Sequence, residues 1–372
     1  MYQVYQRPLK GKSVGVVFGS FAPMHQGHLD IILRAKKEND GGCLVIVCGY
    51  EGDKGEEVDL PLKRRYRYVR ELFVDDDLVA VGAIDDSELN IARYPNGWED
   101  WMKEFNNIYK LFVKNPSQTE KVWYVGDKEY EDGLKIINEK AVLVNRMENP
   151  ICATYIRENP LKYWNKITQP FKRAFSINIL VTGTASEGKT TLVQDLGKYF
   201  NAPYSCEWAR DYMRENSVYD NELDGIDYLA FLYGQYQLNK SKINSDSNKG
   251  IFFADTDSLV TKMYAEYYAK DSTFNLTEEE YIHIARASEV YDEKSKWDKI
   301  FLLAPKNQFF DDHERYMAHS NKEIRQELFD ILCRSIKESG NWNKVVILTG
   351  NYNENFDTIK NYVKEIIDGA NC

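Results

Sequence analysis

Residues 177–190 read INILVTGTASEGKT, an apolar run followed at once by the pattern G-x-x-x-x-G-K-T. The run predicts a buried strand, and a helix is expected to begin at the lysine. Between the two, glycines allow successive backbone N–H groups to converge on phosphate oxygens, and the helix adds the positive end of its dipole. The stretch therefore predicts a phosphate-binding loop inside an α/β domain that occupies the second half of the chain.

The residues of this loop are candidate ATP ligands. Lys189 is expected to reach the β- and γ-phosphates, and the hydroxyl of Thr190 is expected to bind Mg²⁺. The remaining candidate ligands in the loop are Gly183, Ser186, Glu187, Gly188 and Thr191. By itself the pattern indicates only an NTPase or a kinase that binds ATP or GTP.

Two acids follow a second apolar run in the same half, where residues 250–257 read GIFFADTD. A carboxylate at the end of such a strand completes a magnesium site, so Asp255 is expected to bind the metal beside Thr190. Asp257 is a further candidate ligand of the nucleotide. An acid at this turn can equally be the N-cap of the next helix, and for Asp257 that alternative stays open.

The acceptor side of a kinase reaction also needs polar residues. Glu207 lies just past a short expected strand and is the candidate base or acceptor-binding residue, although a structural ion pair with Arg210 would equally explain it. Residues 310–316 form a charged stretch after the strand expected at 300–303. Arg315 in that stretch is expected to reach the transferred phosphoryl group from a lid, with a solvated charged loop as the alternative.

A second nucleotide signature lies near the start, where residues 19–28 read GSFAPMHQGH. Two imidazoles and a helix N-terminus would converge there on one triphosphate, and Gly27 allows the backbone to approach it. In adenylyl transfer the substrate's own phosphate is the nucleophile, so the protein mainly supplies donors that hold the α-phosphate. His25 and His28 are suited to that role. Gly19, Ser20 and Phe21 are candidate binding residues of the same loop.

Hydrophobic periodicity predicts alternating strands and helices in both halves. Strands are expected at 13–18, 43–48, 78–84, 121–125, 141–144, 177–182, 250–254, 300–303 and 344–349. Helices are expected at 27–38, 61–73, 130–138, 189–199, 228–239, 259–269 and 322–339. This pattern is typical of two α/β domains, each built on a doubly wound parallel sheet. We assign 1–160 to the first domain, the aromatic and basic stretch 161–175 to a linker, and 176–372 to the second domain.

Composition limits the class of protein. The chain has 372 residues, of which 43% are hydrophobic and 28% charged, which is typical of a globular protein with two cores. Its net charge of −10 argues against a nucleic-acid partner. The six cysteines form no C-x-x-C pair, so neither disulfides nor a zinc site is expected. The absence of a signal peptide and of a membrane-length apolar span predicts a cytoplasmic protein without a membrane partner. A homo-oligomer remains open.

The signatures together resemble a known family. Residues 19–28 resemble the G-x-F-x-P-x-H-x-G-H signature of nucleotidyltransferases, and residues 151–157, ICATYIR, resemble their second signature, I-S-S-T-x-I-R. Residues 157–164, RENPLKYW, and 94–98, YPNGW, are similar to the NadR type, a nicotinamide-mononucleotide adenylyltransferase fused to a ribosylnicotinamide kinase. The resemblance covers essentially the whole chain. It implies a Rossmann-like nucleotidyltransferase domain followed by a P-loop kinase domain.

The resemblance also implies residue roles. Thr154 and Arg157 would meet the ATP phosphates, and Trp98 would lie against the nicotinamide ring of the mononucleotide. Arg210 and Gln235 align with family positions near the ribosyl substrate. Enterobacterial members carry an additional helix-turn-helix domain, for which this chain has no room before the first expected strand.

The implied reactions are two steps of NAD⁺ salvage. ATP would phosphorylate ribosylnicotinamide, and a second ATP would adenylylate the resulting mononucleotide to NAD⁺ and pyrophosphate. Two alternatives stay open: an adenylyltransferase for another phosphorylated acceptor, and a kinase whose first site has become a sensor of NAD⁺ or another nucleotide. Cys152 and Ala153, which replace the two serines of the second signature, are the feature that favours the sensor.

Overall fold

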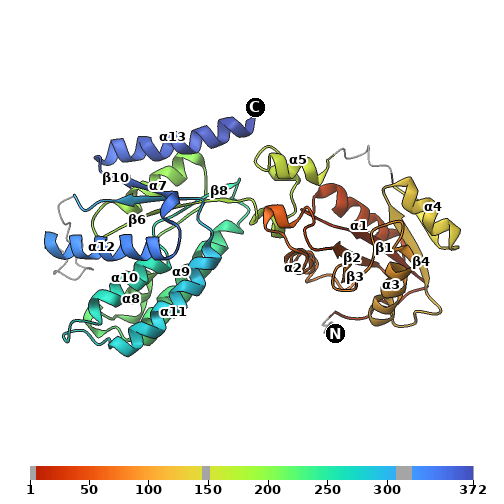
Figure 1. The fold of residues 1–372 in the computed structure, drawn as a ribbon, viewed down its shortest axis with the longest axis horizontal. Coiled ribbons are helices and arrows are strands. Elements are labelled where there is room, and N and C mark those ends of the chain that lie inside the picture. The colour runs from red at the N-terminus through yellow and green to blue at the C-terminus, as the bar shows by residue number, and fades with distance from the viewer. Residues whose placement is uncertain (1–5, 145–150, 307–320, 372) are drawn as a thin grey trace. The chain divides into compact units, whose positions relative to one another are not determined.

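The computed structural model describes residues 6–144, 151–306 and 321–371. The chain divides into two compact units, Met1–Phe175 and Ser176–Cys372. Each unit is built on a five-stranded parallel sheet with helices on both faces (Figure 1). The predicted fold class, two doubly wound α/β domains, is thereby confirmed. No helix among the described residues has the length and apolar character needed to cross a membrane.

The first unit has its central strand at the start of the chain. Its strands are β1 (Ser13–Gly19), β2 (Cys43–Gly49), β3 (Val79–Asp85), β4 (Glu120–Val125) and β5 (Lys140–Leu143). Its helices are α1 (Gln26–Glu38), α2 (Leu62–Leu72), α3 (Trp98–Phe112), α4 (Lys128–Ile136), α5 (Ala153–Glu158) and α6 (Gln169–Lys172). The strand order is β3-β2-β1-β4-β5, so the chain reverses its direction of winding at β1. Ligands of such sheets bind beyond the carboxyl end of the strands at that reversal.

Alternate side chains of this sheet face opposite layers. Val17, Val45 and Val81 pack in the cluster that contains residues of α1, α2 and α6. Val16 and Ile46 pack in the other cluster, with residues of α3 and α4. Burial on both faces is what fully apolar strands such as CLVIVCG at 43–49 predict.

The second unit repeats this plan around the strand that precedes the phosphate loop. Its strands are β6 (Ile177–Gly183), β7 (Tyr204–Ser205), β8 (Ile251–Ala254), β9 (Lys299–Leu303) and β10 (Val345–Leu348), in the order β10-β9-β6-β8-β7. Its helices are α7 (Lys189–Phe200), α8 (Trp208–Asn216), α9 (Gly225–Ile243), α10 (Ser258–Tyr268), α11 (Glu278–Ser295), α12 (Lys322–Glu338) and α13 (Tyr352–Asn371). The loop after β6 therefore lies at the middle of the carboxyl edge.

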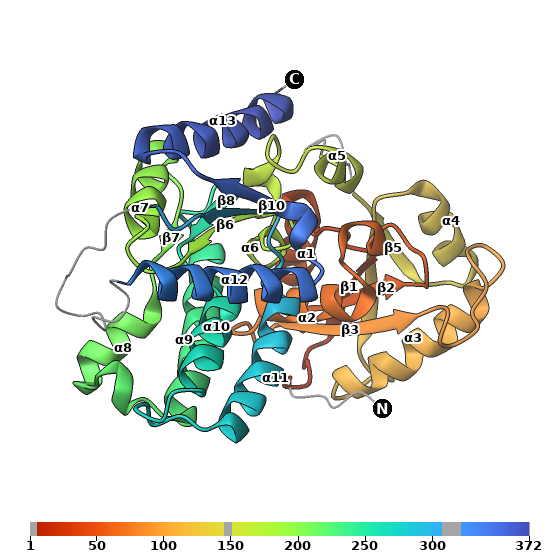
Figure 2. The ribbon, with the colours of Figure 1, turned by 60° about the vertical axis from the view of Figure 1, so that its left-hand side comes forward.

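Helices cover both faces of the second sheet, as Figure 2 shows. Leu180 and Phe252 pack with residues of α10 and α12, whereas Val181 and Phe253 pack with residues of α7 and α13. A third cluster joins residues of α8, α9, α10 and α11 beside the sheet. This helical extension supplies most of the walls of the pocket described below.

Residues 161–175 pack with the first unit. Trp164, Ile167, Phe171 and Phe175 are buried in the cluster of β1 and α2. The stretch also contains the short 3₁₀ helix η3 (Trp164–Lys166) before α6. The segment predicted to be a linker thus contributes four side chains to the core of one unit.

Candidate functional site

The first candidate site is the loop between β1 and α1. His25 is the N-cap of α1, and its backbone N–H donates to Nδ1 of His28 over 3.4 Å. The two imidazole rings are stacked, with centroids 3.8 Å apart and planes 28° apart. Both predicted histidines therefore lie at the N-terminus of one helix, at the carboxyl edge of the central strand. Such a terminus favours anions.

Gly27 allows this close arrangement. A Cβ atom at Gly27 would lie 3.2 Å from a carbon of the His25 ring. Preceding the histidines, Phe21 adopts a φ of 49°, and its ring contacts that of His28 edge-on at 5.1 Å. Gly19, at the end of β1, lies against the same phenyl ring, which a Cβ atom would meet at 3.4 Å. Gly19, Phe21 and Gly27 therefore pack closely around the two imidazole rings.

The second signature lies against this loop, as its resemblance requires. Nη1 of Arg157 donates to the carbonyl oxygen of Ala22 over 2.7 Å, and Nη2 donates to Oγ1 of Thr154 over 3.1 Å. Cys152 is the N-cap of the short helix α5 and makes no capping hydrogen bond with its side chain. The guanidinium is therefore placed beside the histidine loop, although the serine positions of the signature supply no hydroxyl.

The segment 165–168 crosses the histidine loop. Thr168 donates to the carbonyl oxygen of Met24 from both its backbone N–H, over 3.2 Å, and its hydroxyl, over 3.1 Å. Gln26 Nε2 donates to the carbonyl oxygen of Asn165 over 3.0 Å, and Ile167 forms an antiparallel bridge with His25. This contact was not predicted, because no local pattern links residues so far apart in sequence. It fixes the loop that carries the histidines.

A buried ion pair supports the other side of the same loop. Arg65 is fully buried, donates to the carbonyl oxygen of Ser20 over 2.7 Å, and forms an ion pair with Asp53. The sequence offered no signal for it, since Arg65 stands in a basic helix where exposure is the usual outcome. A buried charge without its partner costs several kcal/mol, so Asp53 and Ser20 together keep this arginine in place.

Trp98 begins α3 and belongs to an aromatic cluster at the end of β1. Its ring stacks on Trp101 with centroids 5.5 Å apart and planes 2° apart, and it lies 6.5 Å from the ring of Phe18. Its buried Nε1 has no hydrogen-bond partner among the described residues. At the same edge, burial and the neighbouring Asp85 raise the pKa of Asp86 to about 6. The ring of Trp98 thus lies at the carboxyl end of β1, beside Phe18.

The second candidate site is the phosphate loop after β6. Gly183, Ser186 and Gly188 have φ values of 148°, 65° and 84°, and a Cβ atom at Gly183 would lie 2.8 Å from the carbonyl oxygen of Leu303. Such positive φ values turn backbone N–H groups toward one point, the geometry of an anion-binding nest. Lys189 begins α7 and donates to the carbonyl oxygen of Thr184 over 2.9 Å. Thr191 follows within the first turn of that helix.

Asp255 lies at the carboxyl end of β8, beside this loop. It is fully buried, its Oδ2 accepts a hydrogen bond from Oγ1 of Thr190, and its Oδ1 has no hydrogen-bond partner among the described residues. Burial raises the pKa of Asp255, against the opposing charge of Lys189. Thr190 and Asp255, the two predicted metal ligands, therefore adjoin each other.

The side chain of Glu187 is engaged within the protein. Its carboxylate pairs with the buried guanidinium of Arg325 on α12 over 3.1 Å and accepts a hydrogen bond from the backbone N–H of Lys306 over 3.2 Å. Glu187 was predicted as an ATP ligand, and its backbone belongs to the loop. Its carboxylate instead ties the loop to α12, a contact that the motif alone does not reveal.

Asp257 has the contacts of a helix N-cap. Its Oδ1 accepts hydrogen bonds from the backbone N–H groups of Leu259 and Val260, and its Oδ2 accepts one from Nε1 of Trp297 over 3.1 Å. Burial, followed by the charge of Asp292, raises the pKa of Asp257 to about 7. These are the contacts of the structural alternative that the sequence leaves open.

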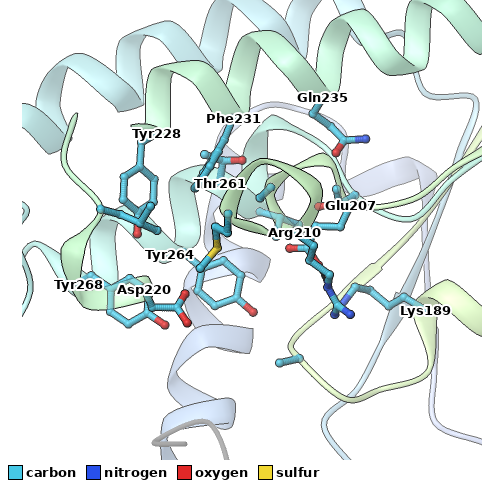
Figure 3. A pocket seen from close by; sticks show the side chains of 16 residues that line it. Lys189, Glu207, Arg210, Asp220, Tyr228, Phe231, Gln235, Thr261, Tyr264 and Tyr268 are labelled. Atoms are coloured by element: carbon cyan, nitrogen blue, oxygen red, sulfur yellow. Dashed lines mark hydrogen bonds and ion pairs between the residues drawn. The ribbon is translucent and has the colours of Figure 1, made fainter. Parts of the chain in front are cut away.

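A pocket lies between the phosphate loop and the helical extension, lined by sixteen residues (Figure 3). Lys189, Glu207 and Arg210 stand together at one end. Oε2 of Glu207 accepts a hydrogen bond from Nε of Arg210 over 2.9 Å. Gln235, on α9, also lines the pocket, and its Oε1 accepts a hydrogen bond from the backbone N–H of Trp208 over 2.8 Å. The structure thus brings the predicted acceptor-side residues to the phosphate loop.

The far end of this pocket is aromatic and was not predicted. Tyr228, Phe231, Tyr264 and Tyr268 line it together with Asp220. They come from three separate elements, α9, α10 and the 3₁₀ helix η4 (Asp220–Glu222). Tyrosines at helical spacing usually indicate core packing, so no local pattern marks these residues as a site. Arg315 lies outside the described residues.

Two family models match the chain, one in each unit. A cytidylyltransferase-like model matches residues 16–159, and an AAA-domain model matches residues 178–355. Among curated proteins, the trifunctional NAD biosynthesis/regulator protein NadR of Salmonella typhimurium is 29% identical over 272 residues, which are 70% of this chain and 64% of that protein. Its counterpart in Escherichia coli is 28% identical over 272 residues, which are likewise 70% of this chain and 64% of that protein. The matching region therefore spans less than two thirds of these relatives.

Two solved structures match almost completely. The crystal structure of a NadR protein in complex with NR has a TM-score of 0.83 and 33% identity, and the match covers 97% of this chain and 98% of that one. A NadR protein in complex with NAD and AMP-PNP has a TM-score of 0.80 and 33% identity, covering 96% and 97%. At this identity over nearly the whole length of both chains, the chain belongs to the NadR family.

Proposed function

We propose that this chain is a bifunctional transferase of NAD⁺ salvage. The second unit phosphorylates ribosylnicotinamide with ATP, and the first unit adenylylates the resulting nicotinamide mononucleotide to NAD⁺ and pyrophosphate. The observation that carries the proposal is the end-to-end match to a NadR protein crystallised with NAD and AMP-PNP. The phosphate-binding motifs after β1 and β6 support it, because each unit has a helix N-terminus suited to phosphate at the centre of its sheet.

In the kinase unit, the phosphate loop holds the triphosphate through its backbone and Lys189. The oxygens of Thr190 and Asp255 suit Mg²⁺, which prefers oxygen ligands and commonly takes only one or two from protein beside phosphate. The unpartnered Oδ1 of Asp255 is free to serve as one of them. Bound there, Mg²⁺ would neutralise charge on the phosphates. Glu207 orients the acceptor hydroxyl and receives its proton, and its contact with Arg210 sets the position of the carboxylate.

In the adenylyltransferase unit, no side-chain nucleophile is needed. His25, His28 and Arg157 hold the α-phosphate while the phosphate of the mononucleotide attacks and pyrophosphate leaves. Thr154 steadies the guanidinium of Arg157 over 3.1 Å. The exposed part of Trp98 lies against the cationic nicotinamide ring.

The two activities can be tested separately on the full-length protein. With ribosylnicotinamide, Mg²⁺ and ATP, the wild type forms the mononucleotide and ADP, and then NAD⁺. Lys189→Ala abolishes formation of the mononucleotide but still converts added mononucleotide to NAD⁺. His28→Ala shows the reverse. If the wild type binds the mononucleotide without converting it, the first unit is a sensor and not an adenylyltransferase. If it adenylylates a different phosphorylated compound instead, the first unit is an adenylyltransferase with another acceptor.

A further inference from the structure

Glu207 lies in a short turn between a strand and a helix. Strand β7 has two residues, and its pairing with β8 ends at Ser205, whose carbonyl oxygen accepts a hydrogen bond from the backbone N–H of Asp255 over 3.0 Å. Helix α8 begins at Trp208. Cys206 and Glu207 lie between these two elements, so the position of the Glu207 carboxylate depends on what holds this turn.

The side chain of Gln235, on α9, holds the turn on both sides of Glu207. Its Oε1 accepts a hydrogen bond from the backbone N–H of Trp208 over 2.8 Å, and its Nε2 donates to the carbonyl oxygen of Cys206 over 3.3 Å. Because these two backbone groups have opposite polarity, they allow only one orientation of the amide. The backbone of Glu207 is thus clamped through both of its neighbours in the chain, and both Gln235 and Glu207 line the kinase pocket (Figure 3).

A second amide, that of Asn239, orients the first. Asn239 lies one turn further along α9, and its Oδ1 accepts hydrogen bonds from Nε2 of Gln235 over 3.0 Å and from the hydroxyl of Ser205 over 2.6 Å. All three residues are buried, so their hydrogen bonds are protected from competition with water. The two amide hydrogens of Gln235 are both donated to protein acceptors, which leaves none for a substrate hydroxyl.

We propose that Gln235 and Asn239 are positioning residues that hold Glu207 in place for the kinase reaction. The inference rests on the proposed function, in which the carboxylate of Glu207 orients the acceptor hydroxyl and receives its proton. Gln235 then acts on the reaction through the backbone of the turn, and not through a hydrogen bond donated to the substrate. Asn239 is not among the residues that line the pocket, so a change there reaches the reaction through the buried hydrogen bonds.

The test removes the acceptor oxygen of Asn239 and measures the kinase reaction of the full-length protein. In Asn239→Leu, a change that nearly preserves shape, kcat with ribosylnicotinamide is expected to fall about tenfold or more, because small displacements of a reacting group are costly. The KM for ATP should change by less than about twofold, because the phosphate loop is outside this network. The double variant Asn239→Leu with Glu207→Gln should be no slower than Glu207→Gln alone, since the clamp acts through that carboxylate.

Gln237→Leu is the matched control, because Gln237 is an amide on the same helix outside the pocket lining, and it should leave kcat unchanged. Ser205→Ala removes one of the two hydrogen bonds to Asn239 and should lower kcat about threefold, so it carries the same comparison with Glu207→Gln if Asn239→Leu does not fold. An unchanged kcat, or a loss that adds to that of Glu207→Gln, would overturn the inference. Failure of the wild type to phosphorylate ribosylnicotinamide at all would instead refute the proposed function.

Discussion

The buried position of Asp255 disfavours the ionised form of its carboxyl group. Burial raises its pKa, so the folded protein binds the carboxyl proton more tightly than the unfolded chain does, and stability falls as the pH rises through that pKa. The proposed metal site requires this carboxylate to be ionised. The residue is therefore better suited to binding a cation than to stabilising the ligand-free fold.

Asp255→Asn tests that balance. We expect the ligand-free variant to melt at a higher temperature than the wild type at pH 7.5, because the amide removes the cost of a buried charge. Kinase kcat is expected to fall about 100-fold or more, since the amide is a poor ligand for Mg²⁺. Differential scanning calorimetry and the kinase assay check the two effects. Asp246→Asn, at an exposed acid, should change neither, and a destabilised Asp255→Asn would contradict the argument.

Asp257 predicts a pH dependence of stability. Its folded pKa is about 7, above the roughly 4 expected in the unfolded chain, so its contribution to stability is fully present below pH 4 and is lost as the pH rises to 7. The loss is on the order of a few kcal/mol for so deeply buried a group. Asp257→Asn keeps the N-cap acceptor and removes the titration. Urea unfolding at pH 5 and pH 7.5 should show a smaller difference for the variant than for the wild type; equal differences would disprove the assignment.

At the scale of elements, α8 and α9 are fitted to each other through one glycine. A Cβ atom at Gly234 would lie 2.4 Å from the ring of Trp208, the first residue of α8. Glu207 and Arg210 flank that tryptophan, so any displacement of the ring moves the acceptor side of the kinase pocket. The close packing of these two helices thus sets the geometry of the pocket.

Gly234→Ala is expected to lower the free energy of unfolding by about 1–3 kcal/mol, because the added methyl group would overlap the ring of Trp208. The KM for ribosylnicotinamide should rise in parallel. The matched control is Gly369→Ala on α13, where an added Cβ meets nothing within 4 Å. That change should be neutral or stabilise by up to about 1 kcal/mol. Chemical denaturation and steady-state kinetics measure both, and a silent Gly234→Ala would contradict this packing.

Local sequence patterns predicted the elements that precede and follow each nucleotide motif. The structure confirms three of these elements within a residue or two: the strands predicted at 13–18 and 177–182 are β1 and β6, and the helix predicted at 189–199 is α7. Their apolar runs and glycine turns are local signals. Helix α11 was not predicted, because two of its three buried residues, Ser288 and Asp292, are polar, so no apolar stripe marks it.

The site was predictable only where a motif carries it. His25, His28 and the phosphate-loop residues follow from short-range spacing, and the structure places them at the centre of their sheets. The aromatic pocket comes from three elements that meet only after folding. The Arg65–Asp53 pair likewise depends on burial, which the basic pattern of α2 argued against. The roles of the motif residues remain proposals for the assays described above.

At the scale of the whole molecule, the boundary between the units has a structural consequence. Trp164, Ile167 and Phe171 are buried in the first unit, so that unit extends to residue 175. Losing a buried aromatic side chain costs about 3–5 kcal/mol, which is a large part of the stability of a typical domain. A first unit that ended at residue 160 would lose from its core the aromatic side chains of Trp164, Phe171 and Phe175, together with Ile167.

Two truncated proteins test this boundary. A fragment of residues 1–175 should fold cooperatively and retain adenylyltransferase activity, because all described contacts of its core and its histidine loop are present. A fragment of residues 1–160 should be unfolded or aggregate. Circular dichroism melting and the NAD⁺-forming assay distinguish them. Comparable stability of the two fragments would show that the segment 161–175 is dispensable.

The hydrogen bonds from Thr168 to Met24 also determine when the histidine loop can be completed during synthesis on the ribosome. Met24 emerges early, but the residue that holds its carbonyl oxygen is 144 positions later in the chain. Strands β1 to β5 can pair before then, whereas the loop bearing His25 is secured only as the phosphate loop of the second unit is about to be made. A nascent chain therefore acquires its first binding site almost at the moment it begins its second.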